Sequence, residues 1–140
     1  MDTRLYTPAL TLRIAFGLMA TLAGLDKFFN ILADWGSYIS PLAAQMLPIP
    51  TGVLMGVVGV VEFTVGVCIL SALPVLGAYV ASAWLMLVAG NLLLGGFIDI
   101  AVRDVVLAFG AFTLARLTEV RQEADARDLA PAKPFHHATA

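Results

Sequence analysis

Charged residues are scarce in this sequence. Only 13% of the 140 residues are Asp, Glu, Lys or Arg, whereas 60% are hydrophobic. A soluble domain carries about 25% charged and roughly 45–50% apolar residues, so the composition argues against an ordinary soluble enzyme. The net charge is −2 and the eight basic residues are scattered along the chain. The sequence therefore offers no basic patch for nucleic acid.

Cysteine and histidine are nearly absent. Cys68 is the only cysteine, and a single thiol excludes an internal disulfide, a CxxC redox centre and a Cys-rich metal site. The only histidines, His136 and His137, lie in the tail, so a haem or zinc site in the apolar part of the chain lacks its usual ligands. We expect no metal site, and the sequence shows no catalytic or redox-centre motif of its own. Whether the protein is an enzyme stays open.

Long apolar runs dominate the rest of the chain. A membrane-spanning helix needs about 20 predominantly apolar residues, and three runs meet this need, at 10–31, 51–70 and 75–97. A fourth, at 98–118, has the right length but contains charged residues. It inserts only if these charges lie near the interfaces or pack against other helices. The alternatives are three spans with a surface helix and, for the first run, a cleaved signal peptide.

The prediction is an all-α integral membrane protein, an antiparallel four-helix bundle in residues 1–119. A polar, partly disordered cytoplasmic tail follows at 120–140. Lys and Arg lie near both termini and are missing from the 32–50 connection, which puts both termini in the cytoplasm. Trp and Tyr favour the membrane interface, so this connection is predicted to form a short interfacial helix over the bundle mouth.

Each predicted span carries a stripe of small residues at helical spacing, which predicts close helix packing. In the first span the stripe includes Gly17 and Gly24, and in the second Gly59 and Gly66. In the fourth span it runs through Asp99, Arg103, Val106, Gly110 and Thr113.

Polar side chains from all four spans are predicted to gather in the outer half of the bundle, at depths estimated from a rise of about 1.5 Å per residue. The predicted ligand-binding site or buried polar network comprises Asp26, Lys27, Glu62, Asn91, Asp99, Arg103 and Asp104. The pocket lining is predicted to include Trp35, Tyr38 and Trp84. Arg13 and Arg116 are interpreted as topology anchors that snorkel to the cytoplasmic surface.

Glu62 is the deepest of these residues, roughly 15 Å into the bundle. An unpaired carboxylate at that depth is costly, so it either pairs with a cation or stays protonated. Lys27 and Arg103 are the cations within reach. Two interpretations stand side by side: a buried ion pair that fixes helix register, and a ligand or proton site.

Several motifs carry a family resemblance. Residues 23–30 (AGLDKFFN), followed by Asp34-Trp35 and Tyr38, resemble the DoxX-like family of small four-span bacterial membrane proteins. The same holds for residues 59–62 (GVVE), 77–79 (GAY), 84–85 (WL) and 99–104 (DIAVRD). The resemblance implies a four-helix bundle in the bacterial cytoplasmic (inner) membrane. It also implies a link to quinone-coupled sulfur oxidation and to membrane complexes that handle oxidative stress.

Two functional hypotheses follow. In the first, the protein is a small subunit or accessory of a quinone-linked membrane redox system. Lys27, Glu62, Asn91 and Arg103 would then lie beside the quinone, and a membrane or peripheral redox protein would be the partner. In the second, it is a non-catalytic scaffold or a lipid or small-molecule binding protein whose buried charges are structural. The lipid bilayer is a partner in both, and a homo-oligomer stays open.

Overall fold

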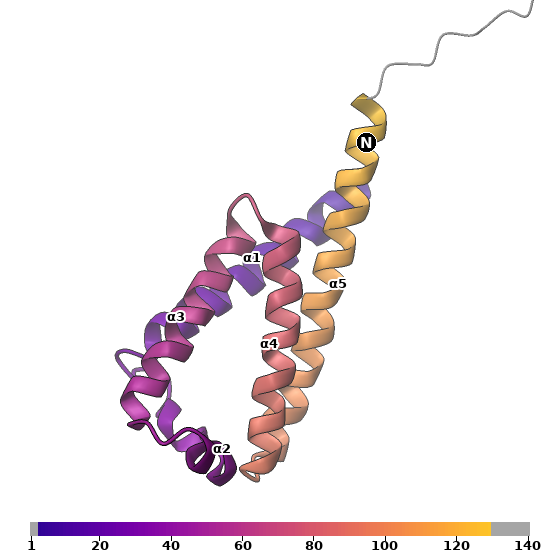
Figure 1. Ribbon diagram of the computed structural model, residues 1–140. Coiled ribbons are helices and arrows are strands. Elements are labelled where there is room, and N and C mark those ends of the chain that lie inside the picture. Colours follow the sequence, from indigo (N-terminus) through magenta and orange to yellow (C-terminus); the bar gives the residue numbers. More distant parts are fainter. Residues whose placement is uncertain (1–2, 130–140) are drawn as a thin grey trace, which may run out of the picture.

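The computed structural model describes residues 3–129, and this part of the chain holds helices and no strand. Four helices are long: α1 (Thr3–Asp26), α3 (Thr51–Leu70), α4 (Pro74–Leu94) and α5 (Ile98–Leu129) (Figure 1). Between α1 and α3 lie a short 3₁₀ helix, η1 (Trp35–Tyr38), and α2 (Pro41–Met46). The prediction of an all-helical protein is therefore confirmed.

The long helices pack as two pairs, α1 with α3 and α4 with α5. The pairs meet at the tight turn between α3 and α4 and diverge away from it, and α2 lies across the far end (Figure 1). At the near end α1 also touches α5, where the Tyr6 ring lies 4.9 Å from the guanidinium carbon of Arg121.

The α1–α3 pair is held close by glycines. A Cβ atom on Gly24 would lie 2.5 Å from the backbone nitrogen of Phe63, and one on Gly66 would lie 2.5 Å from the backbone nitrogen of Thr21. No side chain fits at such distances, so glycine alone lets these two backbones approach as they do.

The α4–α5 pair uses alanine instead. Its buried apolar residues include Ala78, Ala81 and Ala89 on α4 and Ala101, Ala108, Ala111 and Ala115 on α5. This corrects the predicted packing face of α5, because Asp99, Arg103, Val106 and Thr113 are exposed. Of that predicted stripe only Gly110 packs closely, against the ring of Phe16 on α1.

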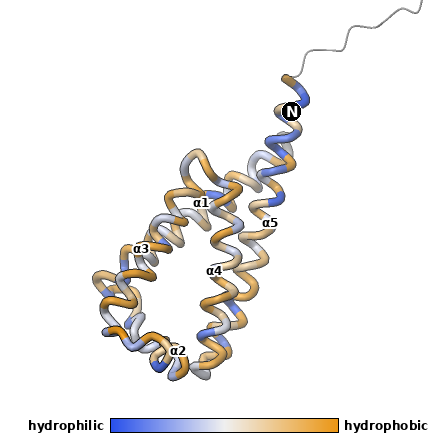
Figure 2. The backbone as a smooth tube through the Cα atoms, in the orientation of Figure 1, coloured by the Kyte–Doolittle hydropathy of each residue, from blue (hydrophilic) through white to orange (hydrophobic). Residues whose placement is uncertain are grey.

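Three helices are long and apolar enough to cross a membrane, over Leu5–Asp26, Thr51–Leu70 and Pro74–Leu94. Their outward faces expose large apolar side chains such as Leu22, Val57 and Leu87. Apolar residues run along both helix pairs, and hydrophilic residues gather on the last turns of α5 (Figure 2). These features indicate a membrane protein. Within residues 3–129, α5 is not among the helices that qualify as spans by composition.

Several helix ends differ from the sequence-based boundaries. The first helix ends at Asp26 rather than near residue 31. α5 continues through 120–129, a stretch predicted to be part of a polar tail, and 130–140 lie outside the described residues. The predicted interfacial helix is two short elements, because Ser40 caps α2 by accepting a hydrogen bond from the Ala43 backbone N–H at 3.1 Å.

Candidate functional site

A buried ion pair joins α1 to α3. Lys27, in the first turn after α1, places its Nζ 2.5 Å from Oε2 of Glu62, in the middle of α3. The Lys27 side chain is 5% exposed and that of Glu62 is 15% exposed. A Cβ on Gly59 would lie 3.1 Å from Cβ of Lys27, so the close approach of the two helices brings the pair together. Of the two predicted cations, Lys27 is therefore the partner of Glu62.

Two tryptophans flank this pair. The Lys27 Nζ lies 3.9 Å from the centroid of the Trp35 ring, a cation–π contact. On the other side, Trp84 on α4 donates its indole N–H to Oε1 of Glu62 at 3.2 Å. Both carboxylate oxygens of Glu62 thus accept a hydrogen bond, one from each helix pair.

Asp26 extends the contacts outward from Trp35. Its Oδ2 accepts the Trp35 indole N–H at 2.7 Å and the Leu32 backbone N–H at 2.9 Å, and its Oδ1 accepts the Ile31 backbone N–H at 2.9 Å. The chain turns sharply here, since Asn30 has a positive φ of 53°. We call Asp26, Lys27, Trp35, Glu62 and Trp84 the tryptophan network.

Asn91 holds the connecting segment rather than the network. Its side-chain N–H donates to the Tyr38 carbonyl at 2.8 Å, and its oxygen accepts the Ser40 backbone N–H at 3.0 Å. The Tyr38 ring packs edge-on against Phe97, with centroids 5.0 Å apart. These contacts fasten η1 and the start of α2 to the far end of α4 and to the turn that follows it. Trp35 and Tyr38 are half-buried, and α2 lies across this end of the long helices (Figure 1).

The charges of α5 form a separate group. Arg103 donates to Oδ1 of Asp104 at 3.0 and 3.1 Å, with its own side chain 62% exposed and that of Asp104 7% exposed. Asp99 is exposed in the first turn of α5. The polar side chains that were predicted to gather in one place therefore form three separate groups. These are the tryptophan network, the hydrogen bonds of Asn91 to Tyr38 and Ser40, and the charges of α5.

Arg13 has a role that sequence reasoning missed. Its guanidinium donates to the carbonyl oxygens of Ile69 at 2.8 Å, Leu70 at 2.9 Å and Ser71. The last carbonyls of a helix have no partner within the helix and carry partial negative charge, so Arg13 caps α3. No local sequence signal shows this, because Arg13 and its acceptors lie more than fifty residues apart.

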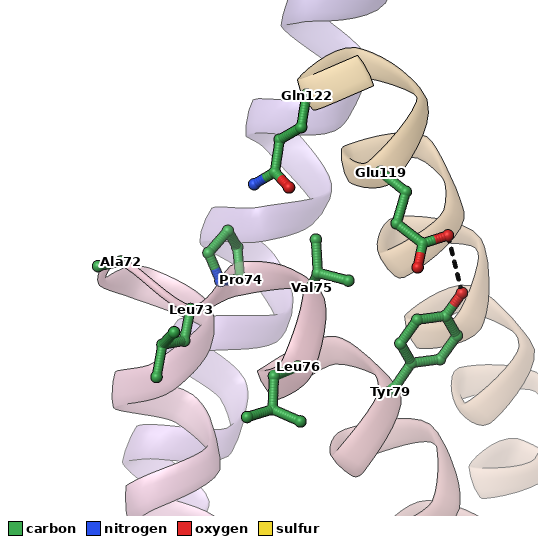
Figure 3. Close-up of a pocket in the computed structure, with 8 residues that line it drawn as sticks. All are labelled: Ala72, Leu73, Pro74, Val75, Leu76, Tyr79, Glu119 and Gln122. Carbon is green, nitrogen blue, oxygen red and sulfur yellow. Dashed lines mark hydrogen bonds between the residues drawn. The ribbon is translucent and has the colours of Figure 1, made fainter. Parts of the chain in front are cut away.

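A second polar contact lies at the α3–α4 turn end. Tyr79 donates its hydroxyl to Oε2 of Glu119 at 3.0 Å (Figure 3). Arg116 pairs with the same oxygen at 2.5 Å. Arg116, predicted as a snorkelling anchor, thus has a partner on its own helix. An open groove of about 360 Å³ between the start of α4 and Glu119 and Gln122 of α5 adjoins this contact.

Within residues 3–129, no group of three or more His, Cys, Asp or Glu side chains is placed to hold a metal ion. Comparison of the chain with known protein families, curated proteins and solved structures found no match.

Proposed function

We propose that the chain is a DoxX-like protein of the bacterial inner membrane, a small accessory subunit of a quinone-linked redox system that binds the quinone ring at the tryptophan network. The observation that carries the proposal is the buried Lys27–Glu62 pair with an indole on either side. Ionisable groups inside a membrane protein often mark ligand or proton sites.

The groups of the network suit a quinone. Its ring is flat and apolar, with two carbonyl oxygens that accept hydrogen bonds and become hydroxyl donors on reduction. Lys27 supplies an ammonium donor, Trp84 an indole donor and Glu62 an acceptor, while the indole faces offer flat apolar area. The chain supplies no redox centre in the described residues, so electrons come from a membrane or peripheral partner protein.

The proposal includes the membrane arrangement. The four long helices cross the bilayer as an antiparallel bundle, with both termini in the cytoplasm. The charges of α5 suit this arrangement, because the buried Asp104 is paired and the exposed Arg103 lies near the helix start, where it reaches the interface.

The second candidate is a non-catalytic scaffold or a lipid or small-molecule carrier. One observation favours it: both Glu62 oxygens accept hydrogen bonds, and no buried side-chain polar atom among the described residues lacks a partner. A network whose hydrogen bonds are all satisfied needs no ligand to complete it, and it can fix the helix arrangement by itself.

The experiment uses tryptophan fluorescence, because the chain has two tryptophans and both belong to the network. A short-chain quinone titrated into the protein in liposomes is expected to quench this emission saturably. In Glu62→Gln, the dissociation constant read from the quenching curve should rise about tenfold or more, since removing a buried polar partner costs at least about 1.4 kcal/mol. Glu119→Gln is the matched control, because it also removes a carboxylate. Glu119 lies on α5 outside the network and accepts a hydrogen bond from Tyr79.

Chromatography of lipids extracted with the purified protein gives an independent measurement. A quinone present at a fixed ratio to the protein, and lost in Glu62→Gln, supports the redox proposal. Quenching that rises linearly and equally in all three proteins, with no quinone in the extract, overturns it and leaves the scaffold.

A further inference from the structure

Residues 27–35, which we call the strap, run from the end of α1 to the first residue of η1. Four of their six exposed side chains are large and apolar, and the other two are Asn30 and Asp34. Phe28, Phe29, Ile31 and Leu32 are all exposed, Ile31 to 81%. These side chains continue the exposed apolar face of α1 formed by Leu22 and Leu25. The bilayer that covers this face of α1 therefore covers the strap as well, because exposed apolar area of this extent is stable against acyl chains and not against water.

The inner side of the strap is polar and shielded. Lys27 is buried although its neighbours Phe28 and Phe29 are exposed, and the Trp35 ring lies over its ammonium group. The strap thus separates a charged pair from the hydrocarbon layer.

One carboxylate holds the strap in place. Asp26 accepts hydrogen bonds from Trp35, Ile31 and Leu32, which lie at the middle and the far end of the strap. The side chain of Asp34, also in the strap, makes no capping hydrogen bond to η1, and the residue is exposed. Because Lys27 is the one buried residue in the strap, packing contributes little and the Asp26 hydrogen bonds carry much of its local stability.

We propose that the strap is a gate between the tryptophan network and the bilayer, and that Asp26 is the positioning residue that keeps it closed by holding Trp35 over Lys27. When the Asp26–Trp35 hydrogen bond breaks, the indole leaves Lys27 and the Lys27–Glu62 pair becomes reachable from the acyl-chain side. A molecule that uses this gate is lipid-soluble and carries a polar head. The identity of that molecule as a quinone rests on the proposed function, but the gate does not.

The test measures the chemical reactivity of Lys27. The sequence has two lysines, Lys27 and Lys133, so the full-length Lys133→Arg protein keeps Lys27 as its only lysine. The protein in liposomes is treated either with a lipid-soluble amine-reactive ester or with its sulfonated, water-soluble counterpart. Peptide mass spectrometry then gives the rate of Lys27 modification for each reagent.

Two variants open the gate by different routes. Asp26→Asn replaces one acceptor oxygen with an N–H donor, so it loses part of its hydrogen bonds. Trp35→Phe keeps a flat ring near Lys27 but removes the indole N–H. Asp34→Asn is the matched control, because it also replaces an aspartate with asparagine, eight residues further along, without touching the Asp26 hydrogen bonds. We expect both gate variants to be modified roughly tenfold faster by the lipid-soluble ester, the factor that loss of a hydrogen bond to a charged group produces.

Each other outcome overturns a stated part of the proposal. Equal rates in Asp26→Asn, Trp35→Phe and Asp34→Asn overturn the gate. An increase in Asp26→Asn alone assigns Asp26 to the backbone turn and overturns the role of Trp35. An equal increase with the water-soluble ester shows that the strap opens to water and overturns the lipid-side gate. No quinone enters this experiment, so its result is independent of the fluorescence titration.

Discussion

Trp84 on α4 donates its indole N–H to Oε1 of Glu62 on α3 at 3.2 Å. This hydrogen bond joins the two helix pairs, whereas the other oxygen of Glu62 accepts from Lys27 within the α1–α3 pair. One carboxylate therefore couples the position of α4 to the charge state of a pair that belongs to α1 and α3. A ligand that displaces Trp84 from Glu62 would loosen the contact between the helix pairs without breaking either pair.

A double-mutant cycle measures how strongly Lys27 and Glu62 interact. Glu62→Gln strands the buried Lys27 ammonium, and we expect a loss of about 3–5 kcal/mol in the free energy of unfolding. Adding Lys27→Met deletes the pair as a whole and should recover part of that loss. Thermal melting in detergent measures both steps, and the coupling energy comes from the cycle.

Arg103→Met is the control for that cycle. Arg103 bonds Asp104 and not Glu62, so this substitution should add independently to Glu62→Gln. Rescue of Glu62→Gln by Arg103→Met, or additive effects of Glu62→Gln and Lys27→Met, would contradict the observed pairing.

From the sequence, the partner of Glu62 could be narrowed to Lys27 or Arg103, because a charge inside a membrane needs a partner. Only the structure selects Lys27. The face of α5 that packs against the other helices could not be predicted. Arg103 and Asp104 are neighbours about 100° apart on a helix, so the inward-facing one is decided by packing against α4, which buries Asp104. The small residues between α4 and α5 are alanines. Alanine also occurs where a helix meets lipid, so it does not mark the packing face in the sequence.

The role of Asp26 was also beyond sequence reasoning. An acidic residue near a membrane surface is usually a solvated anchor, whereas Asp26 is buried and organises the strap. Its contacts depend on where α1 ends, and that boundary was predicted about five residues too late. The turn at Asn30, with its positive φ, is what brings Ile31 and Leu32 back to the carboxylate.

Gly24 tests the close packing of α1 and α3. Gly24→Ala would place a methyl group 2.5 Å from the backbone nitrogen of Phe63, and backbone cannot rotate away as a side chain can. We expect a loss of about 1–3 kcal/mol, typical of overpacking. Gly90→Ala is the matched control within α4, because nothing lies within 4 Å of its Cβ position. Its melting temperature should stay the same or rise slightly, since Ala is the better helix former. An equal fall in both variants would show that backbone flexibility matters here and not close approach.

Substitutions of Arg13 distinguish its role as a cap of α3 from a role as a membrane anchor. Arg13→Lys keeps the positive charge, so membrane orientation should be unchanged. A single ammonium cannot reproduce the guanidinium bonds to Ile69, Leu70 and Ser71. We therefore expect Arg13→Lys to lose about 1–3 kcal/mol in unfolding free energy, close to the loss in Arg13→Gln. A wild-type melting temperature in Arg13→Lys would show that the charge alone is needed.

The last prediction concerns whether α5 crosses the bilayer. By composition α5 is not among the three helices that qualify as spans, but it packs along α4, and Arg121 near its end meets Tyr6 near the start of α1. If α1 and α4 cross the membrane, this contact requires the C-terminal part of α5 to return to the side of the N-terminus. Single cysteines at Ser37 and Thr139, in a Cys68→Ala background, report the two sides through a membrane-impermeant thiol reagent. We expect Ser37→Cys to react from the periplasmic side and Thr139→Cys only after the cells are opened. Reaction of both from the periplasmic side would mean three spans, and the Tyr6–Arg121 contact could then not exist in the membrane.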